Sequence, residues 1–128
     1  MSTAESGTRG HSFWHRAKDK LTGTTQDLEA AELKASAEEV GCKAIARHVD
    51  RERCTLHGTL RHVTLRPHGS AVALEAELYD GSGTVTLVWL GRRQIPGITP
   101  GRQLTVSGRL SCLDGQRLLY NPRYELAA

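Results

Sequence analysis

An aromatic residue and two arginines lie close together in the segment LVWLGRR. Trp89 comes first, and Arg92 and Arg93 follow it after two intervening residues. Single-stranded nucleic acid is bound by aromatic faces that stack on its bases, each worth about 1–3 kcal/mol, and by cations along its backbone. The forked guanidinium of arginine suits phosphate oxygens. These residue types in this order indicate a candidate nucleic-acid surface.

Each of these three residues also has an interpretation without a ligand. Val85 and Leu87 alternate with threonines, and continued alternation turns Trp89 inward as a core residue. A bulge near the end of the strand instead turns the indole outward, where it stacks on a base. Arg92 and Arg93 either contact phosphate or remain solvated surface charges. The sequence leaves both pairs of alternatives open.

A tyrosine and four arginines complete the set of candidate nucleic-acid-binding residues. They are Tyr79, Arg61, Arg109, Arg117 and Arg123. The first three of these arginines occupy outward positions of predicted strands, so they either form one cationic patch or pair with nearby acids. Tyr79 shares a strand face with Glu75 and Glu77. Its ring therefore either stacks on a base or covers a neighbouring strand.

The cationic residues change type along the chain. Lysine and arginine together number 17 and the acids 14, and all eleven cationic residues from position 47 onward are arginines. Arginine suits forked, stacked or phosphate contacts better than lysine does. A coding bias toward arginine explains the pattern equally well.

Motifs for metal binding and catalysis are missing from the sequence. The three cysteines, Cys42, Cys54 and Cys112, show no CxxC spacing, which argues against a zinc ribbon or a disulfide framework and favours the cytoplasm. His57 and His62 are five residues apart, so they face opposite sides of a strand. There is no HExxH motif and no nucleophile elbow. We expect no catalytic residues, no metal and no cofactor, and a protein that is not an enzyme.

The chain divides into three segments. Residues 1–23 are rich in serine, threonine and glycine, and are expected to form a flexible basic tail. Residues 24–52 comprise an acidic helix over 24–40, with Thr24 or Thr25 as its N-terminal cap, and a linker. Residues 53–126 form a folded domain. No apolar run approaches the roughly 18 residues that span a bilayer, so we expect no integral membrane segment.

Apolar and polar residues alternate with a period of two over residues 53–126. Turn signals at 66–70, 80–83, 91–100 and 114–115 divide this region into five strands. Short strands in a flat sheet leave open edges, which closure into a small barrel removes, with Gly58 and Gly108 as bends. The sequence predicts a mainly β fold, a five-stranded oligonucleotide-binding (OB-fold) Greek-key barrel with an N-terminal α-helix.

Several motifs of this region resemble a known domain. LYDGSGTVTLVWLG, ITPGRQLTVSGRL and YNPRYEL resemble the OB wedge domain of RecG-type branch-migration helicases. No helicase motor and no GxxxxGK(S/T) loop is present. The whole chain resembles more closely a family of small, stand-alone actinobacterial proteins described as OB-fold nucleic-acid-binding-domain proteins. The resemblance to the wedge implies binding of unpaired or forked DNA in a basic groove, with Trp89, Arg92 and Arg93 at matching positions.

Two classes of function follow from these observations. The first is a non-enzymatic protein that binds single-stranded or branched nucleic acid. The alternative is a protein-interaction module whose barrel and acidic helix 24–40 dock a partner, and Glu75 and Glu77 fit that alternative better. The sequence determines neither the oligomeric state nor a preference for DNA or RNA.

Overall fold

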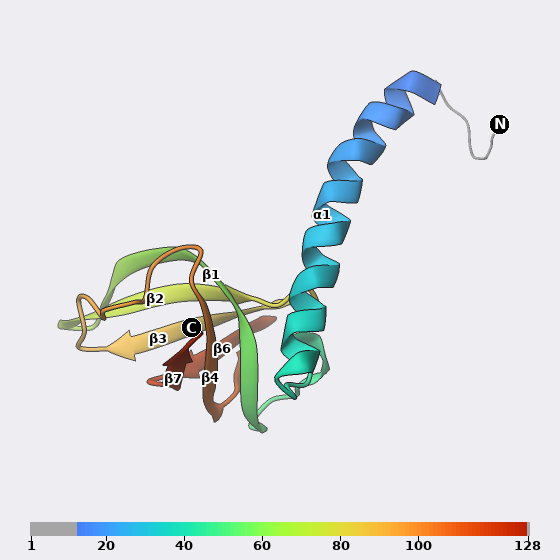
Figure 1. Ribbon diagram of the computed structural model, residues 1–128. Helices are drawn as coiled ribbons and strands as arrows, with labels where there is room; N and C mark the ends of the chain where they lie inside the picture. Colours follow the sequence, from blue (N-terminus) through green and yellow to red (C-terminus); the bar gives the residue numbers. More distant parts are fainter. Residues whose placement is uncertain (1–12, 128) are drawn as a thin grey trace. The chain divides into compact units, whose positions relative to one another are not determined.

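The computed structural model describes residues 13–127, with side chains from Thr25 onward. This part of the chain forms one α-helix, one 3-10 turn and seven β-strands (Figure 1). They are α1 (Phe13–Glu39), η1 (Ile45–Arg47), β1 (Arg53–His68), β2 (Ala71–Tyr79), β3 (Thr84–Leu90), β4 (Gln103–Arg109), β5 (Ser111–Leu113), β6 (Gln116–Tyr120) and β7 (Arg123–Leu126). The chain divides into two compact units, Met1–Ala31 and Glu32–Ala128, and all the strands belong to the second.

The helix begins earlier than the sequence predicts. It starts at Phe13, so the expected N-terminal cap at Thr24 or Thr25 is wrong and part of the expected tail is helical. A glycine inside a helix costs only about 1 kcal/mol relative to alanine, and no proline interrupts this segment. The helix therefore continues through Gly23. The rest of the expected tail, residues 1–12, lies outside the described residues.

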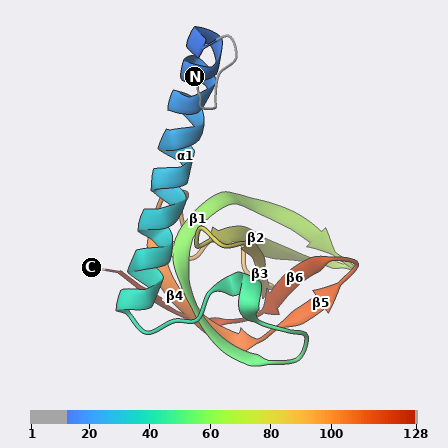
Figure 2. The same ribbon diagram turned by 90° about the vertical axis from the view of Figure 1, so that its right-hand side faces the viewer.

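All seven strands belong to one hydrogen-bonded sheet in the order β5-β6-β3-β2-β1-β4-β7. Neighbouring strands are antiparallel except β3 and β6, which run parallel. The long β1 pairs with β4 through its N-terminal half and with β2 through its C-terminal half. Figure 2 shows β1 curving around the other strands, so the sheet is coiled rather than flat.

The expected closed five-stranded barrel is not confirmed, because the sheet has seven strands and two ends. The fourth and fifth predicted strands are each interrupted, at Leu110 and at Asn121 with Pro122. Asn121 has a left-handed backbone with φ of 50°, a conformation that asparagine tolerates better than most residues. The two interruptions let β6 pair with β3 and β5 while β7 pairs with β4.

Two features of β1 permit its curvature. The register with β2 shifts between Arg61 and Thr64, where His62 has φ of 54°, and a bulge of this kind bends a strand. Gly58 lies so close to the carbonyl group of Tyr79 that a Cβ atom would collide with it. Only glycine fits at this position, which accounts for a glycine inside the strand.

The hydrophobic core lies on the inward faces of the strands. Its fully buried strand residues include Leu56, Leu60, Leu78, Val85, Leu87, Leu104, Val106 and Leu119. Ile45 of η1 and two isoleucines of the connection between β3 and β4, Ile95 and Ile98, belong to the same cluster. Burial of each such side chain contributes about 1.5–3 kcal/mol, so this core fixes the positions of the outward residues between them.

A buried carboxylate joins the β2–β3 turn to the segment that precedes β1. Asp80 is 1% exposed, and its Oδ1 accepts hydrogen bonds from the N–H groups of Ser82 and Gly83 and from the Ser82 hydroxyl. Its Oδ2 accepts one from the N–H of Ile45 at 2.8 Å. The N–H of Ala46 donates to the Ser82 Oγ. The turn predicted from DGSG is confirmed, and it also positions η1.

Candidate nucleic-acid interface

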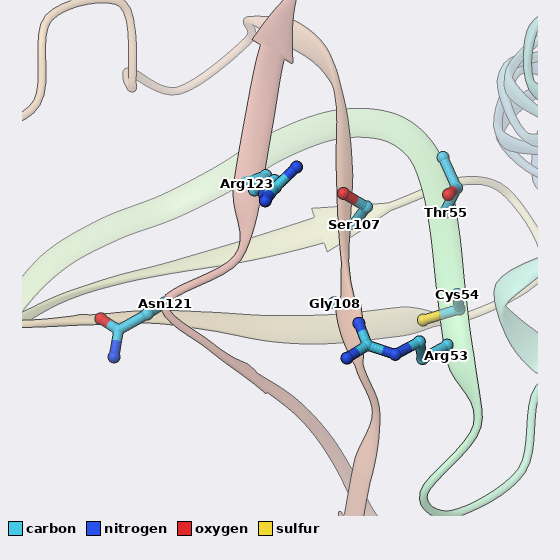
Figure 3. Close-up of a pocket in the computed structure, with 7 residues that line it drawn as sticks. All are labelled: Arg53, Cys54, Thr55, Ser107, Gly108, Asn121 and Arg123. Atoms are coloured by element: carbon cyan, nitrogen blue, oxygen red, sulfur yellow. The ribbon is translucent and has the colours of Figure 1, made fainter.

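A pocket of about 490 Å³ lies over β4, with residues of β1 on one side and of β7 on the other (Figure 3). Its lining residues are Arg53, Cys54, Thr55, Ser107, Gly108, Asn121 and Arg123. The polar side chains come from three neighbouring strands and from the corner between β6 and β7. Segments far apart in the sequence therefore build one site.

The strand register places the polar lining side chains on one face. Thr55 of β1 is directly opposite Ser107 of β4, which is directly opposite Arg123 of β7. Residues directly opposite each other in antiparallel strands have their side chains on the same face. Arg53 precedes Thr55 by two residues and shares this face, opposite Arg109. The face opposite to the core thus carries three arginines on three adjacent strands.

The pocket has a positive charge that nothing in its lining neutralises. None of the lining residues is acidic. Arg53 and Arg123 are exposed, and neither has a salt bridge within the part of the chain that the structure describes. The nearby Glu52 is already engaged, with its carboxylate bound by the N–H of Val49 and by Lys43. Both guanidinium groups are therefore available to an anion.

The Cys54 thiol adds no charge to this pocket. Burial raises the pKa of Cys54 above its ordinary value, and the charges of Glu52 and Cys112 raise it further, against a smaller opposite effect of Lys43. The thiol therefore stays protonated near neutral pH. A protonated thiol is a poor nucleophile, and it leaves the arginines as the charged groups of the pocket.

Asn121 connects the pocket to the predicted arginines of the β3–β4 connection. Its N–H donates to the Val88 carbonyl, and its Oδ1 accepts a hydrogen bond from the Leu90 N–H at 2.9 Å. Arg92 and Arg93 follow Leu90 after one intervening residue, Gly91, and both are exposed. The hydrogen bond between Leu90 and Asn121 thus lies two residues before Arg92 in the chain.

Trp89 lies in the core. Its side chain is 5% exposed, and its Nε1 donates a hydrogen bond to the Pro122 carbonyl oxygen. Its ring also meets Tyr124 edge to face, with 5.9 Å between the ring centroids. This placement favours the packing interpretation of Trp89 over base stacking. Exposed aromatic surface comes instead from two tyrosines, Tyr120 and Tyr124, which the sequence did not single out as site residues.

Arg61 and Tyr79 face a separate part of the surface. The Arg61 guanidinium lies 4.0 Å from the centroid of the Tyr79 ring, and its Nε is 3.5 Å from a Glu77 carboxylate oxygen. On the same face, Glu75 contacts Arg66 and His68. The carboxylates of β2 are thus paired with cations of β1. Of the two alternatives for Arg61, a cationic patch or pairing with a nearby acid, the structure favours the pairing.

The structure does not bring Arg61, Arg109 and Arg117 into one patch. The Nη1 of Arg109 donates to the carbonyl of Arg51, two residues before β1. The Nη1 of Arg117 is 3.5 Å from the Thr84 carbonyl, at the start of β3. Each of the three guanidinium groups has a different partner. Arg61 lies where β1 pairs with β2, Arg109 lies opposite Arg53 at the other end of β1, and Arg117 lies on β6.

Arg53, Thr55 and Ser107 were not predicted as site residues. Each is a single polar residue at an outward position of an alternating strand. Their common feature is the pairing of β1 with β4 and of β4 with β7, which depends on the folded sheet. Arginine at the first position of the first strand was a signal too weak to separate Arg53 from the other arginines.

The described residues contain neither a cluster of metal ligands nor a helix that could span a membrane. No group of three or more histidine, cysteine or acidic side chains lies in an arrangement that holds a metal ion. Within the same residues, no helical segment combines the length and the apolar character that crossing a bilayer requires.

No protein-family model matches the chain, and no curated protein matches it. A structure of RecG bound to a three-way DNA junction is similar in fold, with 21% sequence identity and a TM-score of 0.50. The similarity covers 62% of this chain and 11% of the RecG chain, so this chain corresponds to a small part of RecG. It confirms, at the level of fold, the OB-fold resemblance that the sequence motifs indicated.

A second solved structure is more distantly similar. It is a replication protein A heterotrimer bound to ssDNA, with 16% identity and a TM-score of 0.43, and the match covers 59% of this chain and 57% of that one. We draw no inference from this match, because its TM-score lies below 0.5.

Proposed function

We propose that this chain is a non-enzymatic, cytoplasmic nucleic-acid-binding protein that takes single-stranded or branched nucleic acid. The observation that carries the proposal is the pocket over β4, where Arg53 and Arg123 face solvent without a carboxylate in the lining. Two unpaired arginines beside two hydroxyl side chains suit the phosphates of a nucleic-acid backbone. The fold likeness to RecG bound to a three-way DNA junction supports the same class of ligand.

The proposal includes a path for the strand. A backbone phosphate bound by Arg53 and Arg123 lies next to Asn121, and Asn121 leads through Leu90 to Arg92 and Arg93. The corner between β6 and β7 therefore joins two pairs of arginines. We further propose that β4 with β5, and β6 with β7, act as the fourth and fifth strands of an OB barrel that carries this path.

The alternative proposal, a protein-interaction module, has one observation in its favour. Leu28, an apolar residue on the acidic segment of α1, is 60% exposed. An exposed leucine on a charged helix suits a protein partner better than a nucleic acid. Singly exposed apolar residues are nevertheless common on monomeric proteins, so this observation carries less weight than the pocket.

Fluorescence anisotropy with labelled single-stranded, duplex and forked DNA tests the nucleic-acid proposal. Binding through phosphates must weaken as salt rises, with a slope that reports the number of contacts. We expect the double variant Arg53→Ala with Arg123→Ala to lower that slope by about two contacts. Arg61→Ala is the matched control, since its guanidinium is already held by Glu77 and Tyr79.

Two results would count against the proposal. One is no binding of any of these DNAs at low salt with tens of micromolar protein, a concentration at which even non-specific complexes usually form. The other is binding that Arg61→Ala weakens as much as the double variant does, because that result moves the interface away from the pocket. Circular dichroism melts of each variant show whether a loss of binding reflects a loss of fold.

A further inference from the structure

We infer that the pocket over β4 recognises a phosphate monoester, as found at the end of a nucleic-acid strand or on a nucleotide, in preference to an internal phosphodiester. This inference deepens the proposed function. Recognition of the end of a strand rests on the proposal that the protein binds nucleic acid. The inference concerns the same pocket but names the chemical group that the pocket holds.

The first argument is the charge of the face around the pocket. A phosphate monoester carries about −1.5 to −2 near neutral pH, whereas an internal phosphodiester carries a single charge. Arg53 and Arg123 line the pocket, and Arg109 lies directly opposite Arg53 in the strand register. Like charges directly opposite each other destabilise a strand pair. A doubly charged anion relieves this repulsion better than a singly charged one.

The second argument is the direction of the two guanidinium groups. β4 lies between β1 and β7 in the sheet, so the two outer strands are about 10 Å apart. In Figure 3, Arg53 reaches from β1 toward β4, and the Arg123 guanidinium lies on the β4 side of β7. An anion over β4 is therefore approached from both sides, and each planar guanidinium offers it a forked pair of donors.

The third argument is the supply of uncharged donors between the arginines. Thr55 and Ser107 are directly opposite each other, and neither hydroxyl takes part in a hydrogen bond within the residues that the structure describes. Each hydroxyl can donate one hydrogen bond to a phosphate oxygen. A monoester has three terminal oxygens and an internal diester has two, so two arginines and two hydroxyls lining one pocket match the monoester better.

The fourth argument is the room beside the phosphate position. The pocket of about 490 Å³ lies within the size range of small-molecule sites and is larger than a phosphate group needs. Asn121 lies at the far side from Arg53, and its Oδ1 already accepts the Leu90 N–H. Figure 3 shows the Asn121 amide directed away from Arg53 and Ser107, so this side of the pocket is left open. The pocket therefore has space for the nucleoside attached to the phosphate.

Competition experiments with matched strand ends test this inference. The probes are one labelled single-stranded oligonucleotide with a 5′-phosphate, the same strand with a 3′-phosphate, and the same strand with hydroxyls at both ends. We expect one phosphorylated end to bind about tenfold more tightly than the unphosphorylated strand. Arg53→Ala and Arg123→Ala should each abolish that difference. The control Arg61→Ala should leave it intact, because this guanidinium is held by Glu77 and Tyr79.

Two further probes, deoxyadenosine monophosphate and deoxyadenosine, separate the possible sources of the monoester. Competition by the nucleotide but not by the nucleoside supports the inference. If the nucleotide binds and no DNA binds, the ligand of the pocket is a free nucleotide. Equal binding of all three oligonucleotides overturns the inference and leaves the proposed function standing. A preference for phosphorylated ends that survives Arg53→Ala with Arg123→Ala also overturns it. If none of the probes binds, both proposals fail.

Discussion

The indole Nε1 of Trp89 donates a hydrogen bond to the carbonyl oxygen of Pro122, with 3.1 Å between the two atoms. The next residue, Leu90, donates its N–H to the Asn121 side chain. Two hydrogen bonds thus join the end of β3 to the corner between β6 and β7. Because Asn121 of this corner also lines the arginine pocket, Trp89 helps to hold one border of the pocket in place.

The first prediction concerns the contribution of Trp89 to stability. Trp89→Ala removes a buried aromatic side chain, and we expect it to lower the free energy of unfolding by about 3–5 kcal/mol. Trp89→Phe keeps most of the apolar surface and loses the hydrogen bond to Pro122, so a smaller loss of about 1–2 kcal/mol is expected. Urea unfolding followed by circular dichroism measures both values.

A fluorescence measurement distinguishes packing from base stacking at this residue. In a Trp14→Phe background, emission comes from Trp89 alone. Its burial predicts weak quenching by acrylamide and little change when single-stranded DNA saturates the protein. Strong quenching by bound DNA would show that the indole reaches the ligand, and the packing interpretation would then be wrong.

The second prediction contrasts two strand glycines. A Cβ atom at Gly58 collides with the backbone of Tyr79, whereas one at Gly108 meets its nearest atom, a methyl group of Leu119, at 3.4 Å. We expect Gly58→Ala to lower the free energy of unfolding by about 1–3 kcal/mol or more, and Gly108→Ala to have a clearly smaller effect. Thermal or urea unfolding of the two variants tests the order. Equal losses would contradict the close approach at Gly58.

Local patterns were sufficient to predict most of the strands. The alternation of Val85, Leu87 and Trp89 predicts one buried face of β3, and the structure buries all three. The Asp80 turn is confirmed because an aspartate side chain can bond the N–H groups two and three residues later, whatever the rest of the chain does. Interactions of this kind need only neighbouring residues, so the sequence is enough to find them.

The site depends on information that local patterns do not contain. The row formed by Thr55, Ser107 and Arg123 arises from the pairing of three strands. The break at Asn121, which separates β6 from β7, depends on hydrogen bonds to Val88 and Leu90 of a distant strand. Arginines likewise look alike in a sequence until their acidic neighbours are known. Sequence reasoning therefore included Arg123 and did not find Arg53.

The third prediction concerns the buried Asp80 carboxylate. Asp80→Ala leaves the N–H of Ile45 and those of the β2–β3 turn without their acceptor, and a buried unsatisfied donor costs about 1–3 kcal/mol. We expect a loss of about that size or more in the free energy of unfolding. Hydrogen exchange should show faster exchange of the Ile45 and Ala46 N–H groups. Asp114→Asn is the control, because Asp114 lies in an exposed turn with φ of 51°, a backbone that asparagine tolerates, and it should leave both measurements unchanged.

The fourth prediction concerns acid pH and Glu52. The pKa of Glu52 is lowered from 4.5 to about 2. The largest cause is the hydrogen bond that the Val49 N–H donates to the Glu52 carboxylate, and Lys43 and His48 lower the pKa further. A carboxyl whose pKa is lowered by folding stabilises the folded state above its ordinary pKa, and this stabilisation is lost as pH falls through the folded value. We expect wild type to be more stable than Glu52→Gln above pH 4.5. The difference should shrink between pH 4.5 and about 2.

Urea unfolding at a series of pH values measures this difference directly. Wild type and Glu52→Gln should give curves that converge at the acid end, because a protonated glutamate and a glutamine carry the same charge. Glu125→Gln is the control, because Glu125 is exposed on β7 and forms no salt bridge within the described residues. A gap between wild type and Glu52→Gln that stays constant down to pH 2 would show that the contacts of Glu52 do not depend on its charge.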